Sequence, residues 1–261
     1  MARQRIDALL AERGLFPSRT AAAASVRAGD VRLGADGPTA LKPSQLVPPD
    51  ADLVLRERPR FVSRGGIKLA NALARLGIEV GGRLCLDVGA STGGFTDCLL
   101  QAGAERVAAL DVAYGQLDAR LRDDPRVVVI ERRNARELTP GDLPFAPGLA
   151  VIDVSFISLA KVLPAVASML APAGEVLAMV KPQFEVGKGR VGKGGVVRSA
   201  EERRGAVLAA ARAAEGAGLP IRDFAPSGLP GPKGNVETFV WCGGRGPGVA
   251  DLEDALAGVE V

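Results

Sequence analysis

The sequence contains no histidine, and its three cysteines are scattered. The absence of histidine excludes Ser-His-Asp catalysis, histidine metal ligands and a histidine general base. Cys85, Cys98 and Cys242 form no CxxC pair, so we expect reduced, packed thiols and neither a disulfide framework nor a bound metal ion. Any proton transfer must therefore depend on Lys, Asp, Glu, Cys or Tyr side chains.

Long apolar runs are also missing. No stretch approaches the roughly 18 residues that a membrane-spanning helix needs. The N-terminal sequence MARQRIDALLAERG carries charges within its apolar pattern and has no signal-peptide core. The 261 residues are 47% hydrophobic and 24% charged, which is the composition of a globular protein. These features predict a cytoplasmic protein without a membrane partner.

Positive charge is concentrated near the N-terminus. Residues 1–68 contain 12 Lys and Arg against 7 Asp and Glu, whereas residues 69–261 contain 21 against 23. A basic segment on a nearly neutral body is typical of a module that binds a polyanion such as RNA. A chance asymmetry is the alternative, and an excess of this size does not decide between the two.

The N-terminal segment predicts a small domain. RIDALLAERG and SRTAAAASVRAG have apolar residues at helical spacing, and Ser18 is a favourable N-cap. Short β-type pieces follow near VRLG and ADLVLRE, separated by turn residues. We therefore predict two small helices and a curled hairpin within residues 1–57, followed by a proline-containing linker at residues 58–62.

From residue 63 the pattern changes to alternating strands and helices. Strands are expected at RLCLDVG, RVAALDV, RVVVIE, LAVIDVSF, VLAMVK, LPIRDFAPSG and NVETFVWCG. Helices are expected at IKLANALARLG, YGQLDARLR, LAKVLPAVASML and RSAEERRGAVLAAARAAEGAG, and a glycine-rich turn followed by a helix is expected at STGGFTDCLLQAG. This alternation is typical of an α/β domain whose parallel sheet is covered on both faces. We assign residues 63–245 to that domain and residues 246–261 to a C-terminal tail or helix.

The first strand of this domain ends in a glycine-rich turn, LDVGASTGGF. Gly89, Gly93 and Gly94 permit a tight turn and the close approach of a ligand to the backbone. The spacing is GxxxGG rather than GxGxxG, and Asp87 beside the turn would repel a pyrophosphate but suit a cationic cofactor such as S-adenosylmethionine (SAM). Asp111 ends the next strand, where an acid can accept hydrogen bonds from a ribose diol. A purely structural strand–turn–helix is the alternative.

Two further strands end in charged residues. Asp153 ends the fourth strand and Lys181 the fifth, and the carboxyl ends of parallel strands form the ligand-binding edge of such a sheet. Glu237, early in NVETFVW, is expected to approach from a neighbouring strand. A lysine that snorkels to solvent from the end of a buried strand is the alternative for Lys181. The chain lacks both the D/N-P-P-Y/F motif of adenine amino-methylating enzymes and the Pro-Cys nucleophile of cytosine C5 enzymes.

Together, the motifs SRGGIKL, DVGASTGGF, IDVSFISL, VKPQFEVGKG and GNVETFVW resemble the TlyA family. These are bacterial ribosomal RNA 2′-O-methyltransferases with an FtsJ-like catalytic domain behind an S4 RNA-binding domain. The stretch RIDALLAERG…SRTAAA…AGDVRL is similar to the S4 pattern, so the resemblance covers nearly the whole chain. One difference is that relatives carry a Trp near Arg60 and Phe61, where this chain has Phe.

The resemblance implies a fold and a reaction. The fold is an α/β, Rossmann-like SAM methyltransferase sheet with a small N-terminal α+β domain of the S4 type. The cofactor is SAM, and no metal is needed. The target is a cytidine 2′-hydroxyl in the large-subunit (23S) RNA, and in some members also one in the small-subunit (16S) RNA, within ribosomal subunits.

The resemblance also implies the site residues. The family's Lys-Asp-Lys-Glu tetrad carries over to Lys68, Asp153, Lys181 and Glu237. The candidate cofactor-binding residues are Asp87, Gly89, Ala90, Ser91, Gly93, Gly94, Phe95, Asp111, Asn134 and Asp153. The candidate RNA-binding residues are Arg3, Arg5, Arg19, Arg64, Lys188 and Lys193.

The chemistry expected at the tetrad leaves two roles open for Lys181. A ribose 2′-hydroxyl is a poor nucleophile, so an enzyme must align its oxygen with the methyl group and accept its proton. Lys181 would either take that proton as a neutral amine or position the hydroxyl, with Asp153 and Glu237 holding the lysines. The basic, glycine-rich loop 181–198 is expected to close over RNA, and a solvated surface loop is the alternative.

Other functions remain as alternatives at this stage. The same domain could methylate another RNA or a small molecule. Some relatives carry a haemolysin name, which suggests a pore-former, but the sequence shows no marked basic amphipathic helix. An RNA chaperone with an inert methyltransferase fold is a third alternative, and the complete tetrad argues against it.

Overall fold

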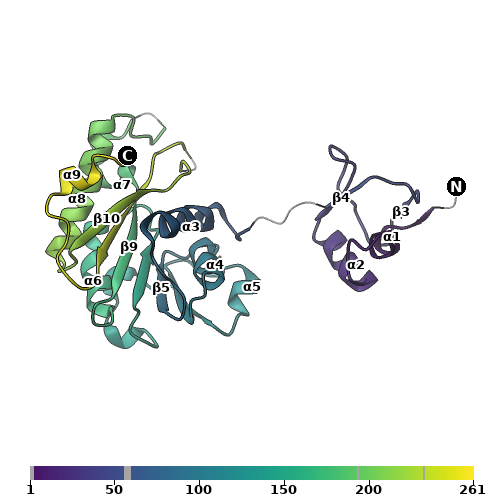
Figure 1. Cartoon of the computed structure of the whole chain (residues 1–261), viewed down its shortest axis with the longest axis horizontal. Helices are drawn as coiled ribbons and strands as arrows, with labels where there is room; N and C mark the ends of the chain where they lie inside the picture. The colour runs from purple at the N-terminus through teal and green to yellow at the C-terminus, as the bar shows by residue number, and fades with distance from the viewer. Residues whose placement is uncertain (1–2, 56–59, 193, 232) are drawn as a thin grey trace. The chain divides into compact units, whose positions relative to one another are not determined.

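The computed structural model describes residues 3–55, 60–192, 194–231 and 233–261. The chain forms two compact units, Met1–Arg60 and Phe61–Val261 (Figure 1). Each unit has a hydrophobic core of its own. The division lies inside the segment 58–62 that the sequence indicates as a linker, and Phe61 is buried within the second unit.

The first unit combines two helices with two small antiparallel strand pairs. Its elements are β1 (Gln4–Arg5), α1 (Ile6–Glu12), α2 (Arg19–Arg27), β2 (Val31–Leu33), β3 (Leu46–Val47) and β4 (Leu53–Leu55). Ser18 caps α2 as predicted, because its Oγ accepts a hydrogen bond from the Ala21 amide at 3.2 Å. β2 and β4, which lie in the two predicted β-type pieces, pair antiparallel, but β3 separates them in the sequence, so they do not form a simple hairpin. The β1–β3 pair was not predicted, since two-residue strands are too short to show an alternating pattern.

The second unit is built on a seven-stranded sheet. Its strands are β5 (Leu84–Val88), β6 (Arg106–Asp111), β7 (Val127–Glu131), β8 (Leu149–Ile152), β9 (Glu175–Val180), β10 (Ile221–Pro226) and β11 (Thr238–Gly243). They lie in the order β10-β11-β9-β8-β5-β6-β7. The five strands from β9 to β7 are parallel, so their carboxyl ends share one edge of the sheet.

The sheet is mostly parallel, as the alternation of strands and helices predicts, and one strand is reversed. β11 runs antiparallel to both of its neighbours, β9 and β10. The connection from β10 to β11 contains no helix within its described residues, and an antiparallel neighbour needs no helical crossover. Because β11 is reversed, it begins at the edge where the parallel strands end. Glu237, which immediately precedes β11, therefore lies at the same edge as Asp153 and Lys181.

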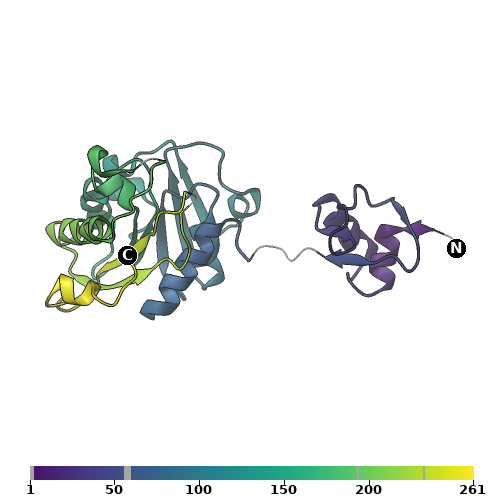
Figure 2. The same ribbon diagram turned by 90° about the horizontal axis from the view of Figure 1, so that it is seen from above.

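Helices cover both faces of this sheet (Figure 1). The helices of the second unit are α3 (Arg64–Leu76), α4 (Gly94–Gln101), α5 (Ala119–Arg122), α6 (Leu163–Met169), α7 (Pro182–Glu185), α8 (Ala200–Gly216) and α9 (Leu252–Leu256), with short 3₁₀ helices η1 (Ala135–Glu137), η2 (Pro140–Asp142), η3 (Leu159–Lys161) and η4 (Lys188–Arg190). Apolar residues of α3 and α4 pack on one face, and those of α6, α8 and α9 on the other. α9 lies beside α8 (Figure 2).

One predicted helix is much shorter in the structure. The stretch YGQLDARLR forms a helix only at its end, α5, because Asp118 accepts a hydrogen bond from the Arg120 amide at 2.9 Å and starts the helix there. α4 begins at Gly94, after the glycine-rich turn, as predicted. Among the described residues, no helix combines the length and the apolar character needed to cross a membrane.

Candidate active site

The glycine-rich turn after β5 packs directly against the end of β8. Gly89 has a φ of +88°, and a Cβ atom placed on it would lie 2.6 Å from the carbonyl oxygen of Asp153. Ser91 also has a positive φ, of 49°, which is uncommon for a residue with a side chain. The turn is thus held in a conformation that exposes its backbone at the carboxyl edge of the sheet.

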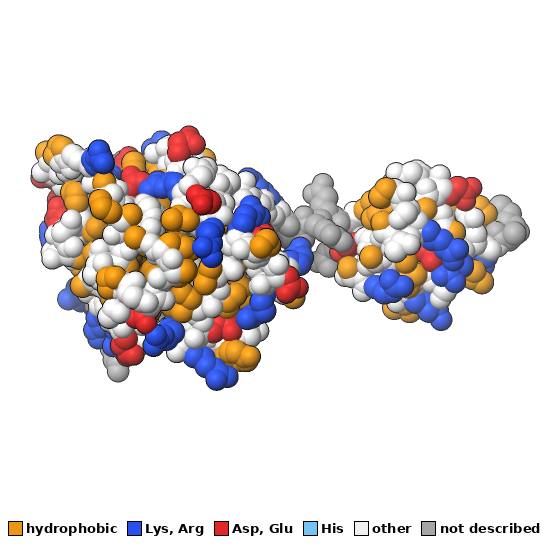
Figure 3. All heavy atoms as spheres, turned by 90° about the horizontal axis from the view of Figure 1, so that it is seen from below, with side chains coloured by type: hydrophobic (Ala, Val, Ile, Leu, Met, Phe, Trp, Pro, Cys, Tyr) orange, Lys and Arg blue, Asp and Glu red, His pale blue; other side chains and the backbone are white. Residues whose placement is uncertain are grey.

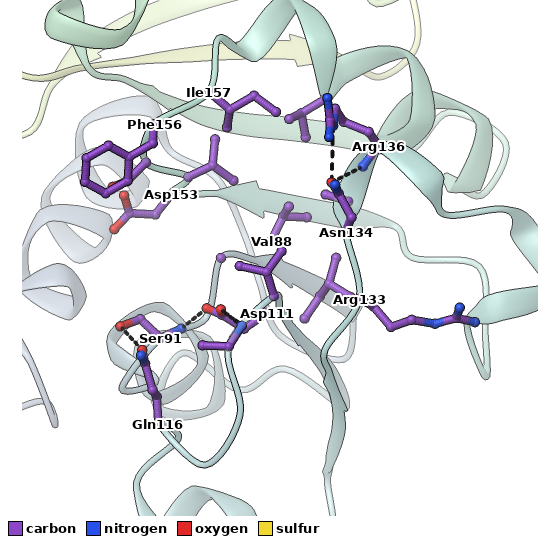
Figure 4. Close-up of a pocket in the computed structure, with 18 residues that line it drawn as sticks. Val88, Ser91, Asp111, Gln116, Arg133, Asn134, Arg136, Asp153, Phe156 and Ile157 are labelled. Atoms are coloured by element: carbon purple, nitrogen blue, oxygen red, sulfur yellow. Dashed lines mark hydrogen bonds between the residues drawn. The ribbon is translucent and has the colours of Figure 1, made fainter.

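A cavity of about 550 Å³ opens beside this turn (Figure 4). Asp111 lies in its wall, and both of its carboxylate oxygens accept backbone hydrogen bonds, from Ser91 N at 2.7 Å and from Ala113 N at 2.8 Å. Ser91 Oγ donates to Gln116 Oε1 at 3.3 Å, and Asn134 Oδ1 accepts from the Arg136 amide at 3.2 Å. The polar groups of the wall are therefore fixed in place before any ligand binds.

Asp87 lies behind the turn and is completely buried. Thr96 Oγ1 donates to its Oδ2 at 2.6 Å, whereas its Oδ1 has no hydrogen-bond partner among the described residues. Burial raises the pKa of Asp87 to about 7, with the Thr96 hydrogen bond opposing the shift and the charges of Asp153 and Asp111 adding to it. A buried carboxyl with an unpaired oxygen favours a nearby positive charge.

A second cavity, of about 430 Å³, adjoins the first. The two share Gly89, Ser91 and Asp153 in their walls. Lys68, Lys181 and Glu237 line the second cavity together with Asp153. The structure thus brings all four residues of the predicted tetrad to one place, from α3, β8, β9 and β11.

The tetrad forms two lysine–carboxylate pairs. Lys68 Nζ donates to Glu237 Oε2, and both side chains are buried. Lys181 Nζ lies 2.5 Å from Asp153 Oδ1 and donates to Ser155 Oγ at 3.0 Å. Because Asp153 Oδ1 has no aligned hydrogen-bond donor among the described residues, this contact is an ion pair rather than a directed hydrogen bond. The carboxylates hold both lysines in fixed positions.

The other predicted cofactor residues divide between the two cavities. Asn134 lines the first, and Ala90, Gly94 and Phe95 line the second. Gly93 belongs to neither lining within the described part of the chain; its missing Cβ makes room for Leu117 and Leu121. The missing side chain of Gly93 thus lets the turn pack closely against these two leucines.

Sequence reasoning missed two residues beside the tetrad. Ser155 binds Lys181, and Phe156 has a φ of +64° with 91% of its surface exposed. The Phe156 ring lies 5.1 Å from that of Phe184, and both rings line a third cavity, of about 390 Å³, together with Lys181. A serine and an aromatic residue directly after the Asp153 strand are the signal that could have identified them.

The predicted RNA-binding residues differ in their surroundings. Arg5 Nη2 lies 2.7 Å and Arg19 Nε 3.3 Å from the buried carboxylate of Asp7, while both arginines remain partly exposed. These ion pairs, led by the Arg5 hydrogen bond, lower the pKa of Asp7. Arg3 is exposed, and Arg64 lines the second cavity and donates to Pro230 O at 2.8 Å. Lys193 and the side chain of Lys188 lie outside the described residues.

One face of the first unit carries several Lys and Arg side chains close together (Figure 3).

Within the described residues of the whole chain, no group of three or more Cys, Asp or Glu side chains is arranged to hold a metal ion.

The strand order, the glycine-rich turn and the cavity at the carboxyl edge define a Rossmann-like methyltransferase fold. The family model of FtsJ-like methyltransferases matches residues 61–244. The chain is 50% identical over 259 residues to the 16S/23S rRNA (cytidine-2′-O)-methyltransferase TlyA of Mycobacterium tuberculosis, covering 97% of this chain and 96% of that one. The chain belongs to the TlyA family of FtsJ-like methyltransferases.

Two other relatives carry a hemolysin name. Hemolysin A of Brachyspira hyodysenteriae is 36% identical over 234 residues, which cover 89% of this chain and 97% of that one. A solved structure of a hemolysin-named protein from Streptococcus thermophilus is 38% identical, with a TM-score of 0.73, over 98% of this chain and 95% of that one. One family thus includes both kinds of name.

Proposed function

We propose that this protein is a SAM-dependent 2′-O-methyltransferase that acts on a cytidine ribose in ribosomal RNA. The observation that carries the proposal is the pair of adjoining cavities, of which one presents fixed acids and the other the lysine–carboxylate pairs. The name of the Mycobacterium tuberculosis relative supports ribosomal RNA, cytidine and the ribose 2′-oxygen as the target. A complete tetrad at the carboxyl edge favours catalysis over a membrane-active role.

The first cavity suits SAM in size and in charge. Its volume of about 550 Å³ lies in the range of small-molecule sites. Asp111 is held where it can accept hydrogen bonds from ribose hydroxyls, and the buried Asp87 behind the turn favours a cation. Asp153 in the same wall is already paired with Lys181, and Arg133 and Arg136 also line the cavity. When bound, SAM would supply an activated methyl group on a positively charged sulfur.

The chain's own residues then orient the ribose oxygen and receive its proton. Lys181, held by Asp153 and Ser155, can direct the 2′-hydroxyl toward the shared wall of the two cavities. The hydroxyl proton becomes strongly acidic as the oxygen is methylated, so the Lys181–Asp153 pair can accept it late in the reaction. Lys68, neutralised by Glu237, supports the opposite side of the same cavity.

The third cavity lies where the target base would extend from that ribose. Phe156 and Phe184 supply exposed aromatic surface, on which an unstacked base can rest. Lys181 and Glu237 line the same cavity, so a base bound there would leave its ribose close to the tetrad.

The proposed activity is tested by incubating the protein with methyl-labelled SAM and separated ribosomal subunits or their RNAs. We expect label in ribosomal RNA, and mapping of the modified position should place it on a cytidine 2′-oxygen. Label on a nucleobase, on another RNA class alone, or on no RNA would contradict the proposal.

SAM binding is expected to strengthen as pH rises through about 7. A cationic ligand favours the ionised form of Asp87, whose pKa is about 7 without ligand, so binding must release a proton below that pH. Calorimetry between about pH 6 and pH 7.5 should therefore show weaker binding at the acidic end. The Asp87→Asn variant controls for titration of the ligand itself. An unchanged pH dependence in that variant would refute the assignment to Asp87.

We further infer that the first unit is an S4-like RNA-binding domain. Its excess of positive charge supports this, and so does the absence of cofactor and tetrad residues from its sequence. A fragment of residues 61–261, which contains both cores of the second unit, is expected to bind SAM normally but to lose most of its RNA affinity and methylation.

RNA affinity of the full chain should fall steeply with salt, and that of the fragment only weakly. Charge reversal of Arg5 or Arg19 is a poor substitute for this comparison, because both hold Asp7 and the variants would disturb the fold. Equal methylation of RNA by the fragment and the full chain would show that the first unit is not the RNA anchor.

A further inference from the structure

The end of the basic loop is fastened to segment 235–237, which directly precedes β11 and carries Glu237. Asn235, which is 2% exposed, accepts a hydrogen bond at Oδ1 from Val197 N at 2.9 Å and donates from Nδ2 to Gly195 O at 2.8 Å. Val197 is itself buried. Residues 195–197 are therefore held by Asn235, which is two positions from Glu237 in the sequence.

A second anchor on the same segment comes from α8. The guanidinium of Arg203 donates from Nη1 to Arg198 O at 2.7 Å and to Val197 O at 3.3 Å. Its Nε donates to Val261 O at 2.8 Å. Three backbone carbonyls from two distant segments thus converge on one planar donor group, whose rigid fork fixes their relative positions.

The C-terminal residues that Arg203 holds also reach the start of β11. Thr238 Oγ1 donates to Glu260 O at 3.4 Å, and Thr238 directly follows Glu237. Arg203 thus links Val261 to segment 195–198 through hydrogen bonds. Asn235 in turn links that segment to the residues just before β11, which include Glu237.

Segment 195–198 forms part of the substrate side of the site. Gly195, Asn235 and Glu237 line the third cavity together with Lys181. Among the described residues that line the first cavity, none lies C-terminal to Val162. Movement of this segment would thus change the RNA side of the site and leave the cofactor side intact.

We propose that Arg203 is a positioning residue for methyl transfer, which holds segment 195–198 against segment 235–237 by binding the backbone carbonyls of residues 197, 198 and 261. This inference rests on the proposed function. It assigns to Arg203 a role distinct from phosphate binding, because its Nε and Nη1 atoms already donate to backbone carbonyls.

The test compares Arg203→Met with Arg204→Met in the full chain. Arg204 is a matched control, since it also anchors the C-terminal segment, through Glu253 O at 2.7 Å and Leu256 O at 3.4 Å, while its described contacts do not include segment 195–198. We expect Arg203→Met to lower kcat/KM for RNA about tenfold, as small displacements in active sites do. SAM affinity should stay within about twofold in both variants, because the first cavity is unaffected.

Melting temperatures of the two variants separate positioning from general destabilisation. Arg203→Lys, which keeps the charge but loses the planar fork, should fall between wild type and Arg203→Met in kcat/KM, and it replaces Arg203→Met if that variant does not fold. The inference would be overturned by wild-type turnover in the Arg203 variants or by an equal loss of kcat/KM in Arg204→Met. A parallel loss of SAM affinity in Arg203→Met would also overturn it. Absence of RNA methylation by the wild-type protein would instead overturn the proposed function itself.

Discussion

Replacement of Lys181 by methionine is expected to lower methyl transfer about a thousandfold, the range in which loss of a proton-transferring or aligning group falls. Methionine keeps the length and apolar stem of lysine but cannot bind Asp153 or Ser155, which hold the ammonium at 2.5 and 3.0 Å. Lys181 is absent from the described lining of the first cavity, so SAM affinity should change by no more than a few fold. Single-turnover methylation and calorimetry measure the two quantities separately.

The Lys181→Arg variant distinguishes the two roles that the sequence left open for this residue. Arginine keeps the positive charge but does not lose its proton in proteins. Substantial activity in Lys181→Arg would indicate that the residue positions the hydroxyl and that Asp153 takes the proton. Loss equal to that of Lys181→Met would indicate proton transfer by the lysine itself. Near-normal turnover in Lys181→Met would contradict the assignment of this site altogether.

Replacement of Gly89 by valine should have the second large effect, on SAM binding. A Cβ atom at this position would meet Asp153 O at 2.6 Å, and the turn would have to move away from β8. We expect SAM affinity to fall about a hundredfold. A loss of this size corresponds to two hydrogen bonds between SAM and the displaced turn, at about 1.4 kcal/mol each. Equilibrium dialysis or calorimetry with SAM measures the change.

Gly82→Val is the matched control for this prediction. Gly82 has a φ of +71°, so valine there carries a similar backbone strain of about 1–2 kcal/mol. A Cβ at Gly82 meets no atom within 4 Å, and the residue precedes β5 at the opposite edge of the sheet from the cavities. Equal loss of SAM affinity in the two variants would mean that backbone strain alone causes the effect. Unchanged affinity in Gly89→Val would refute the assignment of the turn to the SAM site.

Most of the fold could be predicted because its elements have strong local signals. The strands β5, β6, β8 and β9 are buried apolar runs. Successive residues along each strand face opposite sides of the sheet, and on β5 Leu86 lies in one core and Cys85 in the other. The reversal of β11 was not predicted, although LPIRDFAPSG and NVETFVWCG have no predicted helix between them, and a connection without a helix favours antiparallel pairing. The short extent of α5 was missed because the helical spacing of YGQLDARLR outweighed the Asp118 cap.

The site was harder to predict than the fold. The glycine-rich turn and the residues that end β6, β8 and β9 could be assigned to one edge from topology alone. The pairing of Lys68 with Glu237 could not, because these residues are far apart in the sequence and meet only through the reversed strand. Ser155 and Arg203 likewise act through contacts that depend on the folded backbone.

The residues that line the first cavity are translated before the lysine–carboxylate pairs of the second cavity are complete. The described lining of the first cavity comes entirely from residues 88–162, whereas the lysine–carboxylate pairs need residues from Lys68 to Glu237. A ribosome that has made residue 162 has already supplied the whole of that wall. The chain acquires its second pair only after residue 237 has been translated, so a growing polypeptide passes through lengths that contain the proposed cofactor residues without both lysine–carboxylate pairs.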